Sequence, residues 1–200
     1  MKTMYTGLTS PQADYIHTPL IEIAPVDDNT ALLQAAQDID SYDYVLFTSR
    51  YTAQYVGKMF ARAKQIVSIG STTSAALHRV GIDKVIQVDG DNSYGVLAWF
   101  KNQPCGRVLI PRSNLALPII PKGLRELGFK VDCITAYINQ MPEHPQKICL
   151  DEVERIVFTS PSTIDNFIRL YGALPTDKTF VTRGPITEQH LQQKIKQQRL

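Results

Sequence analysis

The feature that most constrains this chain of 200 residues is a motif that occurs twice, with its copies about 110 positions apart. The first copy, YVLFTSRYTAQYV, covers residues 44–56, and the second, RIVFTSPSTIDNFI, covers residues 155–168. Each copy joins an apolar run to Phe-Thr-Ser and then to a helix-like stretch, whose predicted apolar face carries Tyr55 or Phe167. Because the separation is far longer than a solenoid repeat, it predicts two similar lobes.

A second pair of matching segments follows the first in both halves. VSIGSTTSAAL, which contains Gly70 and Thr73, is echoed by VTRGPITEQHL, which contains Gly184 and Thr187. Two matched pairs in one order and at nearly one offset are hard to obtain by chance, so they indicate an internal duplication.

The rest of the sequence repeats one local pattern. Runs rich in β-branched residues are each followed by Ser, Thr, Gly or Asn and then by a helical pattern, as in residues 73–80, which Gly81 closes. Strands that alternate with helices predict parallel βαβ units, with Ser or Thr as N-caps and Gly81 and Gly128 at C′. The predicted fold is therefore α/β, with two small doubly wound, flavodoxin-like lobes built on parallel sheets. The predicted strands are residues 44–47, 66–69, 85–88, 108–110, 156–158 and 180–181.

Two extended segments, residues 17–25 and 131–138, interrupt this alternation close to prolines. We expect them to lead into and out of one continuous lobe, residues 24–141. The other lobe is then discontinuous and consists of residues 1–23 and 142–200. Paired with each other, the two segments would form a two-stranded hinge on which the lobes close over a ligand.

Composition and charge exclude several classes of protein. Lys and Arg outnumber Asp and Glu by only 21 to 19, so no basic field favours nucleic-acid binding. No apolar run approaches the ~20 residues of a membrane span, and residues 1–7 lack the apolar region of a secretory signal. Three cysteines and four histidines, none at metal-binding spacing, predict neither a disulfide scaffold nor a metal site. We expect a cytoplasmic monomer that binds a small molecule and has no metal site.

The strand-to-helix joints are the candidate site, because ligands of open parallel sheets bind beyond the carboxyl ends of the strands. The joints supply hydroxyls and main-chain N–H groups at helix starts, which favour negative charge. Nearby positive charge comes from Arg50, Arg112 and Arg183. The predicted ligand is an anion with several carboxylates or phosphates. A single Ser or Thr before a helix is usually only a cap, so the prediction depends on five joints that face one crevice. The candidate residues are Thr48, Ser49, Arg50, Gly70, Ser71, Thr72, Thr73, Arg112, Ser113, Asn114, Thr159, Ser160, Ser162, Gly184 and Thr187.

Other chemistries lack their sequence signatures. Neither a GxGxxG nor a GxxxxGK[ST] phosphate-binding loop is present. The sequence also lacks a GxSxG motif, so Ser49, Ser160 and Ser162 are not predicted to be nucleophiles. Aromatic side chains at helical spacing, such as Tyr55 and Trp99, are interpreted as core.

The order of the motifs resembles that of the uroporphyrinogen-III synthase family. The resemblance extends from about residue 42 to residue 191 and is closest in VLIPRSNLALPIIPKGLRELGFKVDCITAY, residues 108–137, and in VFTSPSTIDNF, residues 157–167. It implies two HemD-like α/β lobes joined by a two-stranded linker. It also implies a lyase that cyclises hydroxymethylbilane to uroporphyrinogen III, with loss of water, inversion of ring D and no cofactor.

The same resemblance implies roles for individual residues. Tyr137 aligns with a linker tyrosine of the family and would donate a hydrogen bond to the departing hydroxyl. Thr73 and Thr187 occupy the family's cleft-facing threonine positions and would bind substrate carboxylates together with the Phe-Thr-Ser serines.

The sequence departs from the family pattern in the discontinuous lobe. A Thr-Arg strand end and most of a helix are missing before residue 17, and a further strand and helix are missing at the C-terminal end. Arg183-Gly184 replaces Ile-Gly, and an expected helix at residues 115–119 lacks its Arg. We therefore keep a second interpretation, a two-lobed module that binds a polycarboxylate or tetrapyrrole without turnover.

Overall fold

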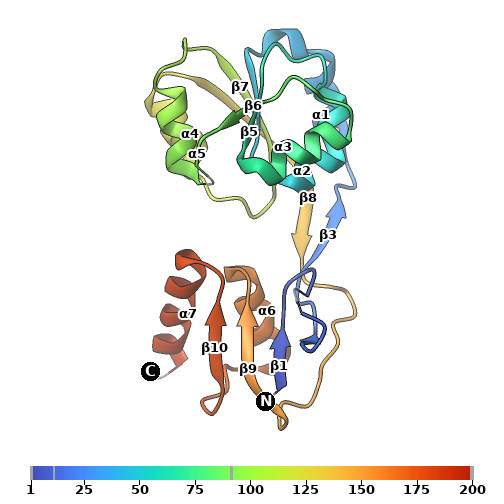
Figure 1. The fold of residues 1–200 in the computed structure, drawn as a ribbon, viewed down its shortest axis with the longest axis vertical. Coiled ribbons are helices and arrows are strands. Elements are labelled where there is room, and N and C mark those ends of the chain that lie inside the picture. Colours follow the sequence, from blue (N-terminus) through green and yellow to red (C-terminus); the bar gives the residue numbers. More distant parts are fainter. Residues whose placement is uncertain (1, 11, 91, 199–200) are drawn as a thin grey trace. The chain divides into compact units, whose positions relative to one another are not determined.

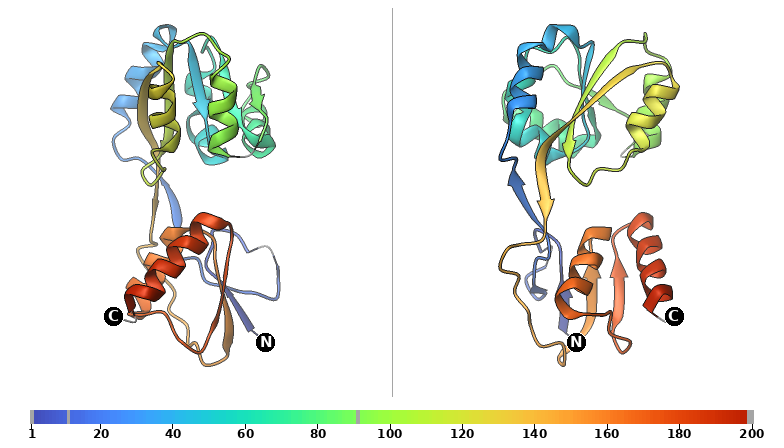
Figure 2. Two further views of the ribbon diagram at one scale, coloured as in Figure 1. Left: turned by 90° about the vertical axis from the view of Figure 1, so that its left-hand side faces the viewer. Right: turned by 180° about the vertical axis from the view of Figure 1, so that it is seen from behind.

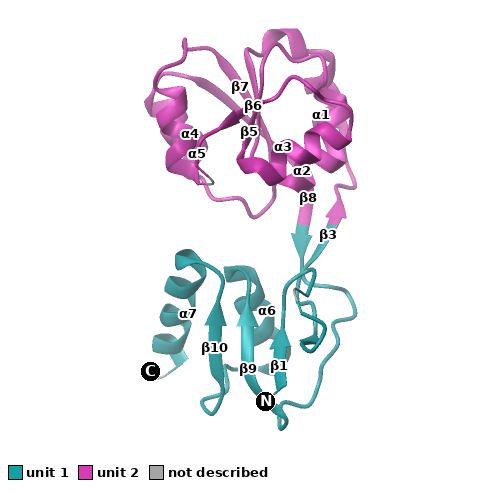
Figure 3. Ribbon diagram, in the orientation of Figure 1, with its two compact units in different colours: residues 1–23, 139–200 teal, residues 24–138 magenta. Residues whose placement is uncertain are grey.

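The structure is a computed structural model that describes residues 2–10, 12–90 and 92–198. The chain divides into two compact units (Figure 3): unit 1 comprises residues 1–23 and 139–200, and unit 2 comprises residues 24–138. Both units contain a parallel sheet with helices packed on it, which confirms the predicted α/β class.

Unit 2 is built on a sheet with the order β3-β8-β7-β4-β5-β6 (Figure 1). Pairing is parallel from β8 through to β6, so these strands end at one common edge. The β-branched runs explain the central strands, because such side chains pack well on a pleated, buried surface. The strands are β3 (Glu22–Pro25), β4 (Tyr44–Phe47), β5 (Ile66–Ile69), β6 (Ile86–Val88), β7 (Arg107–Ser113) and β8 (Lys130–Gln140).

Helices cover both faces of the unit 2 sheet, as the views in Figures 1 and 2 show. The aromatic core on one face is centred on Tyr44, whose ring meets Phe100 and Phe129 edge-on at 5.3 and 6.0 Å. The helices are α1 (Thr30–Gln37), α2 (Arg50–Val56), α3 (Gly70–Arg79), α4 (Ser93–Phe100) and α5 (Ile119–Glu126), with 3₁₀ turns η1 (Ile39–Ser41) and η2 (Gly57–Phe60).

Unit 1 has a smaller parallel sheet with the order β10-β9-β1-β2. Its core is separate from that of unit 2 and contains Met4, Phe158 and Phe167, all fully buried. Between β1 and β2 no helix occurs in the described residues 6–10 and 12–15. The elements are β1 (Lys2–Tyr5), β2 (Ile16–His17), β9 (Val153–Phe158), β10 (Thr179–Thr182), α6 (Pro161–Tyr171) and α7 (Pro185–Gln198).

The chain passes between the units in two strands, β3 and β8, which are neighbours in the six-stranded sheet. At the far end of β8, the Gln140 side-chain amide donates to a Glu22 carboxylate oxygen at 2.8 Å. The two segments expected to form a linker are therefore paired. Within the described residues, none of the helices is long and apolar enough to cross a bilayer.

The local predictions were mostly confirmed, with three corrections. Ser49 and Ser160 are N-caps, and Gly81 and Gly128 follow their helices with φ of 87° and 92°. However, α3 begins at Gly70 without a side-chain cap, because its N-cap residue is Ile69, whose side chain has no hydrogen-bonding group. Ser74, inside the helix, bonds to the Gly70 carbonyl and to Ser68 Oγ. Residues 115–118 are not helical, since α5 starts only after Pro118. Tyr55 is 43% exposed instead of core.

Candidate functional site

The carboxyl ends of the unit 2 strands place the predicted hydroxyl groups along one edge of the sheet, here called rim 2 (residues 48–51, 70–73, 112–114 and 137). Ser49 follows β4 and caps α2, because its Oγ accepts a hydrogen bond from the Tyr51 N–H at 3.2 Å. Tyr137 reaches the same rim from β8, where it lies in register with Ser113 of the neighbouring strand β7. Two segments far apart in sequence thus meet at this edge.

The central feature of rim 2 is a contact between Ser49 and Tyr137. Their hydroxyl oxygens lie 3.1 Å apart, within hydrogen-bond distance. Two rings of helix α2 contact the Tyr137 ring: that of Tyr51 meets it edge-on at a centroid distance of 6.0 Å, and that of Tyr55 stacks on it at 6.3 Å. The Asn114 N–H also donates to the Tyr137 carbonyl at 3.3 Å. Only 7% of the residue is exposed, so the phenol is largely shielded from solvent.

The two arginines predicted for rim 2 differ in what they contact. Arg50 is exposed; its guanidinium donates to the Tyr51 hydroxyl at 2.9 Å and lies over that ring. Arg112 instead donates to the main-chain carbonyls of Ala116 and, at 3.2 Å, Leu117. The Arg112 guanidinium therefore holds the loop that follows its own strand, whereas Arg50 faces solvent and can meet an anion.

The remaining rim 2 candidates fall into exposed and buried groups. Ser71, Thr72 and Asn114 are exposed, whereas Thr73 is only 5% exposed and packs inside the unit. Thr48 and Ser113 are half-buried, and Ser113 Oγ accepts from the Leu115 N–H at 3.1 Å. Gly70 is buried and has a φ of 67°, a left-handed conformation that favours glycine. A side chain at residue 70 would be strained, so the glycine keeps this corner tight.

Unit 1 has its own edge of this kind, here called rim 1 (residues 5–7, 17, 159–163, 183–184 and 187). The second Phe-Thr-Ser motif is closed on itself: Ser160 Oγ lies 2.8 Å from Ser162 Oγ. Thr163 Oγ1 accepts from the N–H groups of Thr159 and Ser160 at 3.2 and 3.3 Å. Thr163 Oγ1 thus binds the two N–H groups that precede α6 and donates to the Ser160 carbonyl at 2.7 Å. The hydroxyls of Ser160, Ser162 and Thr163 are therefore bonded to one another or to the main chain.

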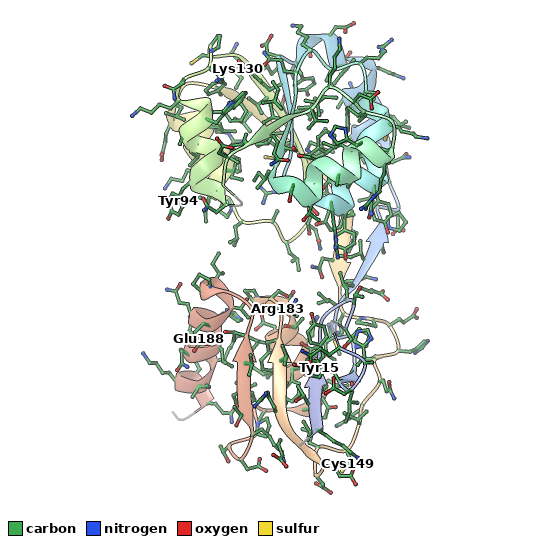
Figure 4. The ribbon with its side chains drawn as sticks, viewed as in Figure 1. Tyr15, Tyr94, Lys130, Cys149, Arg183 and Glu188 are labelled. Carbon is green, nitrogen blue, oxygen red and sulfur yellow. The ribbon has the colours of Figure 1, made fainter. Side chains whose placement is uncertain are left out.

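Three further side chains complete rim 1, and sequence reasoning missed two of them. Arg183, labelled in Figure 4 at the end of β10, places its guanidinium 5.5 Å from the centre of the Tyr5 ring. His17 Nε2 lies 2.8 Å from the Gly7 carbonyl, so this nitrogen carries the proton and donates. Tyr5 and His17 carried no sequence signal, because only the pairing of β1 with β2 and β9 brings them to this edge.

The other predicted rim 1 residues are Thr159, Gly184 and Thr187. Thr159 Oγ1 is buried with no protein partner in the described structure and lies against Gly7, where a Cβ would approach Thr159 Cγ2 to 2.7 Å. Gly184 is exposed with a φ of 101°, and Thr187 is 3% exposed. Among the described residues no cluster of three or more His, Cys, Asp or Glu side chains could hold a metal ion.

Together these features define a class of α/β protein in which a duplicated Phe-Thr-Ser and Gly-x-x-Thr framework presents hydroxyls, main-chain N–H groups and an exposed arginine at the strand ends of each unit. Residues 3–198 match the family model described as uroporphyrinogen-III synthase HemD. The chain therefore belongs to the uroporphyrinogen-III synthase family, as the motifs predicted.

Two curated proteins illustrate the relationship in sequence. The chain is 28% identical over 194 residues to the porphyrin biosynthesis protein HemD of Ruminiclostridium josui, an alignment that covers 88% of this chain and 38% of that protein. It is 25% identical over 187 residues to a putative uroporphyrinogen-III synthase of Methanothermobacter thermautotrophicus, which covers 82% of this chain and 74% of the relative. The chain thus spans well under half the length of the first relative and most of the second.

Solved structures show the same fold at lower sequence identity. A mutant uroporphyrinogen III synthase from the extremely thermophilic bacterium Thermus thermophilus superposes with a TM-score of 0.66 at 16% identity, covering 96% of this chain and 88% of that one. Uroporphyrinogen-III synthetase from Helicobacter pylori gives a TM-score of 0.66 at 15% identity with the same coverage.

Proposed function

We propose that this chain is a uroporphyrinogen-III synthase, a lyase that cyclises hydroxymethylbilane to uroporphyrinogen III with loss of water and inversion of ring D. The observation that carries the proposal is the match of residues 3–198 to the family model. The two rims support it, because a linear tetrapyrrole with acetate and propionate groups needs many weak donors spread over its length.

The reaction requires one proton donor and a binding surface that fixes the conformation of the substrate. The nitrogen of the terminal pyrrole pushes its electron pair toward the hydroxymethyl carbon, and the C–O bond breaks with its electron pair on oxygen. A proton from an acid converts the departing hydroxyl to water. The electrophilic carbon then bonds to a carbon of ring D, a spiro intermediate rearranges, and loss of a proton from a ring carbon completes the macrocycle.

Tyr137 is the proposed acid. Its phenol is buried, packed against the rings of Tyr51 and Tyr55, and placed at the strand-end edge where ligands of parallel sheets bind. The proton that the ring carbon loses at the end of the reaction restores the phenol, so the protein is unchanged over one turnover. No oxidant, metal or covalent intermediate is needed for this sequence of steps.

Carboxylate binding is assigned to the exposed donors of both rims. On rim 2 these are Arg50, Ser71 and Thr72, with the main-chain N–H groups at the start of α3; on rim 1 they are Arg183 and the groups around Gly184. Charge-assisted hydrogen bonds to a carboxylate are stronger than neutral ones. Holding the bilane at several points favours the inverted closure over the spontaneous, uninverted one, because orientation is then already determined.

The test is to supply freshly prepared hydroxymethylbilane and separate the products by isomer. We expect predominantly the type III isomer, and we expect Tyr137→Phe to lower its rate of formation by about tenfold. The loss is smaller than general acids usually give, because the pyrroles themselves drive departure of the hydroxyl. Treatment with excess EDTA should leave the rate unchanged.

The second candidate is a module that binds a polycarboxylate or tetrapyrrole without turnover. It is favoured by the small sheet of unit 1 and by the absence of a helix between β1 and β2 in the described residues. The same assay separates the two functions. Only type I product, formed at the uncatalysed rate while the protein binds the bilane, would identify the module and overturn the lyase.

A further inference from the structure

We propose that Ser49 is a positioning residue for Tyr137: the Ser49 Oγ–H donates to Tyr137 Oη and leaves the phenolic proton for the substrate. The two oxygens are 3.1 Å apart, a distance at which either hydroxyl can be the donor. The inference rests on the proposed function, since it gives a task to the second hydroxyl of that site. Its direction follows from the other bonds that each hydroxyl makes.

The bonding of Ser49 leaves its proton available. A serine hydroxyl has one proton and two acceptor lone pairs. One lone pair is occupied by the Tyr51 N–H, which donates to Ser49 Oγ at 3.2 Å as part of the N-cap of α2. Capping uses an acceptor and no proton, so the Ser49 Oγ–H is free to donate. Tyr137 Oη lies within its reach.

The bonding of Tyr137 points in the same direction. A phenol also has one proton, and an acid must direct that proton at the substrate and not at a neighbour. If Tyr137 donated to Ser49, this bond would have to break before each turnover. With Ser49 as donor, the contact persists throughout and the Tyr137 proton remains outward. The stacked ring of Tyr55 and the edge-on ring of Tyr51 pack against the phenol of Tyr137 throughout.

The same contact stabilises the step that follows. When Tyr137 gives its proton to the departing hydroxyl, negative charge develops on Oη, and a hydrogen bond to a charged acceptor is about twice as strong as a neutral one. Ser49 therefore stabilises the transition state more than the ground state, which is the condition for raising turnover. When the ring carbon later releases its proton, Oη is protonated again and the Ser49 bond returns to its neutral strength.

The duplication supplies a matched control. Ser160 occupies the same place in the second Phe-Thr-Ser motif and also precedes a helix, but its Oγ lies 2.8 Å from Ser162 Oγ and not against a phenol. Replacing either serine removes a hydroxyl from an equivalent corner. Only the replacement of Ser49 removes a bond to the proposed acid.

The direction of the bond can be measured without turnover. The tyrosine doublet in the Raman spectrum distinguishes a phenol that accepts a hydrogen bond from one that donates. The chain has nine tyrosines, so the spectrum of Tyr137→Phe is subtracted from that of the full chain to isolate Tyr137. We expect an acceptor signature that Ser49→Ala abolishes and Ser160→Ala leaves in place. A donor signature in the unaltered chain would overturn the proposal.

Kinetics on hydroxymethylbilane give the second readout. Ser49→Ala should lower kcat about fivefold with KM unchanged, and Ser49→Thr should restore most of it. Ser49→Gly keeps a tolerated N-cap residue and should lose as much kcat as Ser49→Ala, which separates the lost donor from a lost cap. Ser160 bonds to Ser162 and not to the proposed acid, so Ser160→Ala should not reproduce the loss of kcat.

Two outcomes keep this inference distinct from the proposed function. In a Tyr137→Phe background, Ser49→Ala should cause no further loss of kcat; an additional loss of about fivefold would show that Ser49 acts elsewhere and would overturn the positioning role. If the unaltered chain forms no type III product, the lyase fails, yet the Raman signature still decides which hydroxyl donates.

Discussion

The two Phe-Thr-Ser corners have the same sequence and the same place in their sheets, yet they bond differently. The strand order β5-β4-β7-β8 of unit 2 corresponds to β10-β9-β1-β2 of unit 1. By this correspondence Tyr137 on β8 has its counterpart on β2, where His17 donates to a main-chain carbonyl. On rim 2 the Tyr137 phenol is hydrogen-bonded to a serine side chain, whereas the equivalent ring on rim 1, that of His17, is hydrogen-bonded to the main chain.

The comparison shows which part of a duplicated motif is local. Capping of α2 and α6 needs only the residues of the motif, so both copies have an N-cap serine. The partner of the serine hydroxyl is not fixed by the motif: for Ser49 it is Tyr137, which comes from another strand. We infer that the proton donor is confined to unit 2 and that unit 1 contributes binding, and the following predictions test this division.

The largest expected effect is on the free energy of unfolding, when one buried side chain on a central strand of each unit is replaced by alanine. Leu46 on β4 and Ile156 on β9 are both fully buried, in cores that share no residue. Replacing either by alanine should lower the free energy of unfolding by about 2–5 kcal/mol. Trp99, the single tryptophan, packs on the unit 2 core, so Leu46→Ala should shift the urea transition followed by its fluorescence. Ile156→Ala should shift circular dichroism alone; equal shifts in both signals would mean that the units unfold as one.

The next largest loss of unfolding free energy should come from replacing either of the two equivalent glycines, Gly70 and Gly184, by alanine. Gly70 and Gly184 both have positive φ, of 67° and 101°, although one is buried and the other exposed. Gly184→Ala should cost about 1–2 kcal/mol of unfolding free energy from the backbone alone, since no atom lies within 4 Å of the added Cβ. Gly70→Ala should cost at least as much. A neutral Gly184→Ala, measured by urea denaturation, would break the equivalence of the two corners.

The exposed arginines test whether both rims bind the substrate. Arg50→Gln and Arg183→Gln should each raise KM for hydroxymethylbilane about threefold, with kcat nearly unchanged, because solvent screens exposed ion pairs. Arg79→Gln makes the same change of charge at the C-terminal end of α3 and serves as the control. If only Arg50→Gln changed KM, binding would belong to rim 2 alone.

The smallest expected effect is the loss of stability at low pH, when the carboxylates of Asp43 and Asp165 are protonated. The Arg107 N–H and the Lys64 ammonium donate to Asp43 and lower its pKa. Burial would raise the pKa of Asp165, but hydrogen bonds from Lys194 and His190 outweigh it and lower that pKa as well. Each carboxylate therefore contributes stability above its unfolded pKa of about 3.9, and the contribution is lost as the pH falls through the folded pKa.

The matched substitutions are Asp43→Asn in unit 2 and Asp165→Asn in unit 1. Each should remove less than about 1 kcal/mol of stability at pH 7 and little at pH 3, because both sites are partly exposed. Urea titrations at the two pH values should show the Asp43→Asn effect in Trp99 fluorescence and the Asp165→Asn effect in circular dichroism. A larger loss at pH 3 than at pH 7 would reverse the predicted sign.

Much of the fold could be predicted from the sequence, because its signals are local. β-Branched runs gave the strands at residues 44–47 and 66–69 with correct bounds, and Gly81 and Gly128 ended their helices as expected. The exposure of Tyr55 was predicted wrongly, since its helical spacing matched a core position but its ring stacks on Tyr137 at the rim. Periodicity cannot distinguish these two environments.

The site could be predicted in outline but not in its contacts. Ser49 and Tyr137 were both candidates, although nothing in the sequence joins them, since their contact depends on how β4, β7 and β8 are ordered. Arg112 was assigned to an anion because of its charge, yet the structure gives its guanidinium to the carbonyls of its own loop. The type of a residue shows which bonds it can make, whereas its partners depend on the folded structure around it.

The position of β1 in its sheet has a consequence for synthesis of the chain. β1 lies between β2 and β9, and its first residue, Lys2, pairs with the Glu152 region 150 positions further along. At about 5–20 residues per second, a ribosome needs roughly 8–30 seconds to make that partner. Unit 2 is one continuous segment and is synthesised before β9, so the apolar side chains of Met4 and Tyr5 lack their β9 partners while unit 2 folds. We therefore expect nascent chains that stop before β9 to bind chaperones.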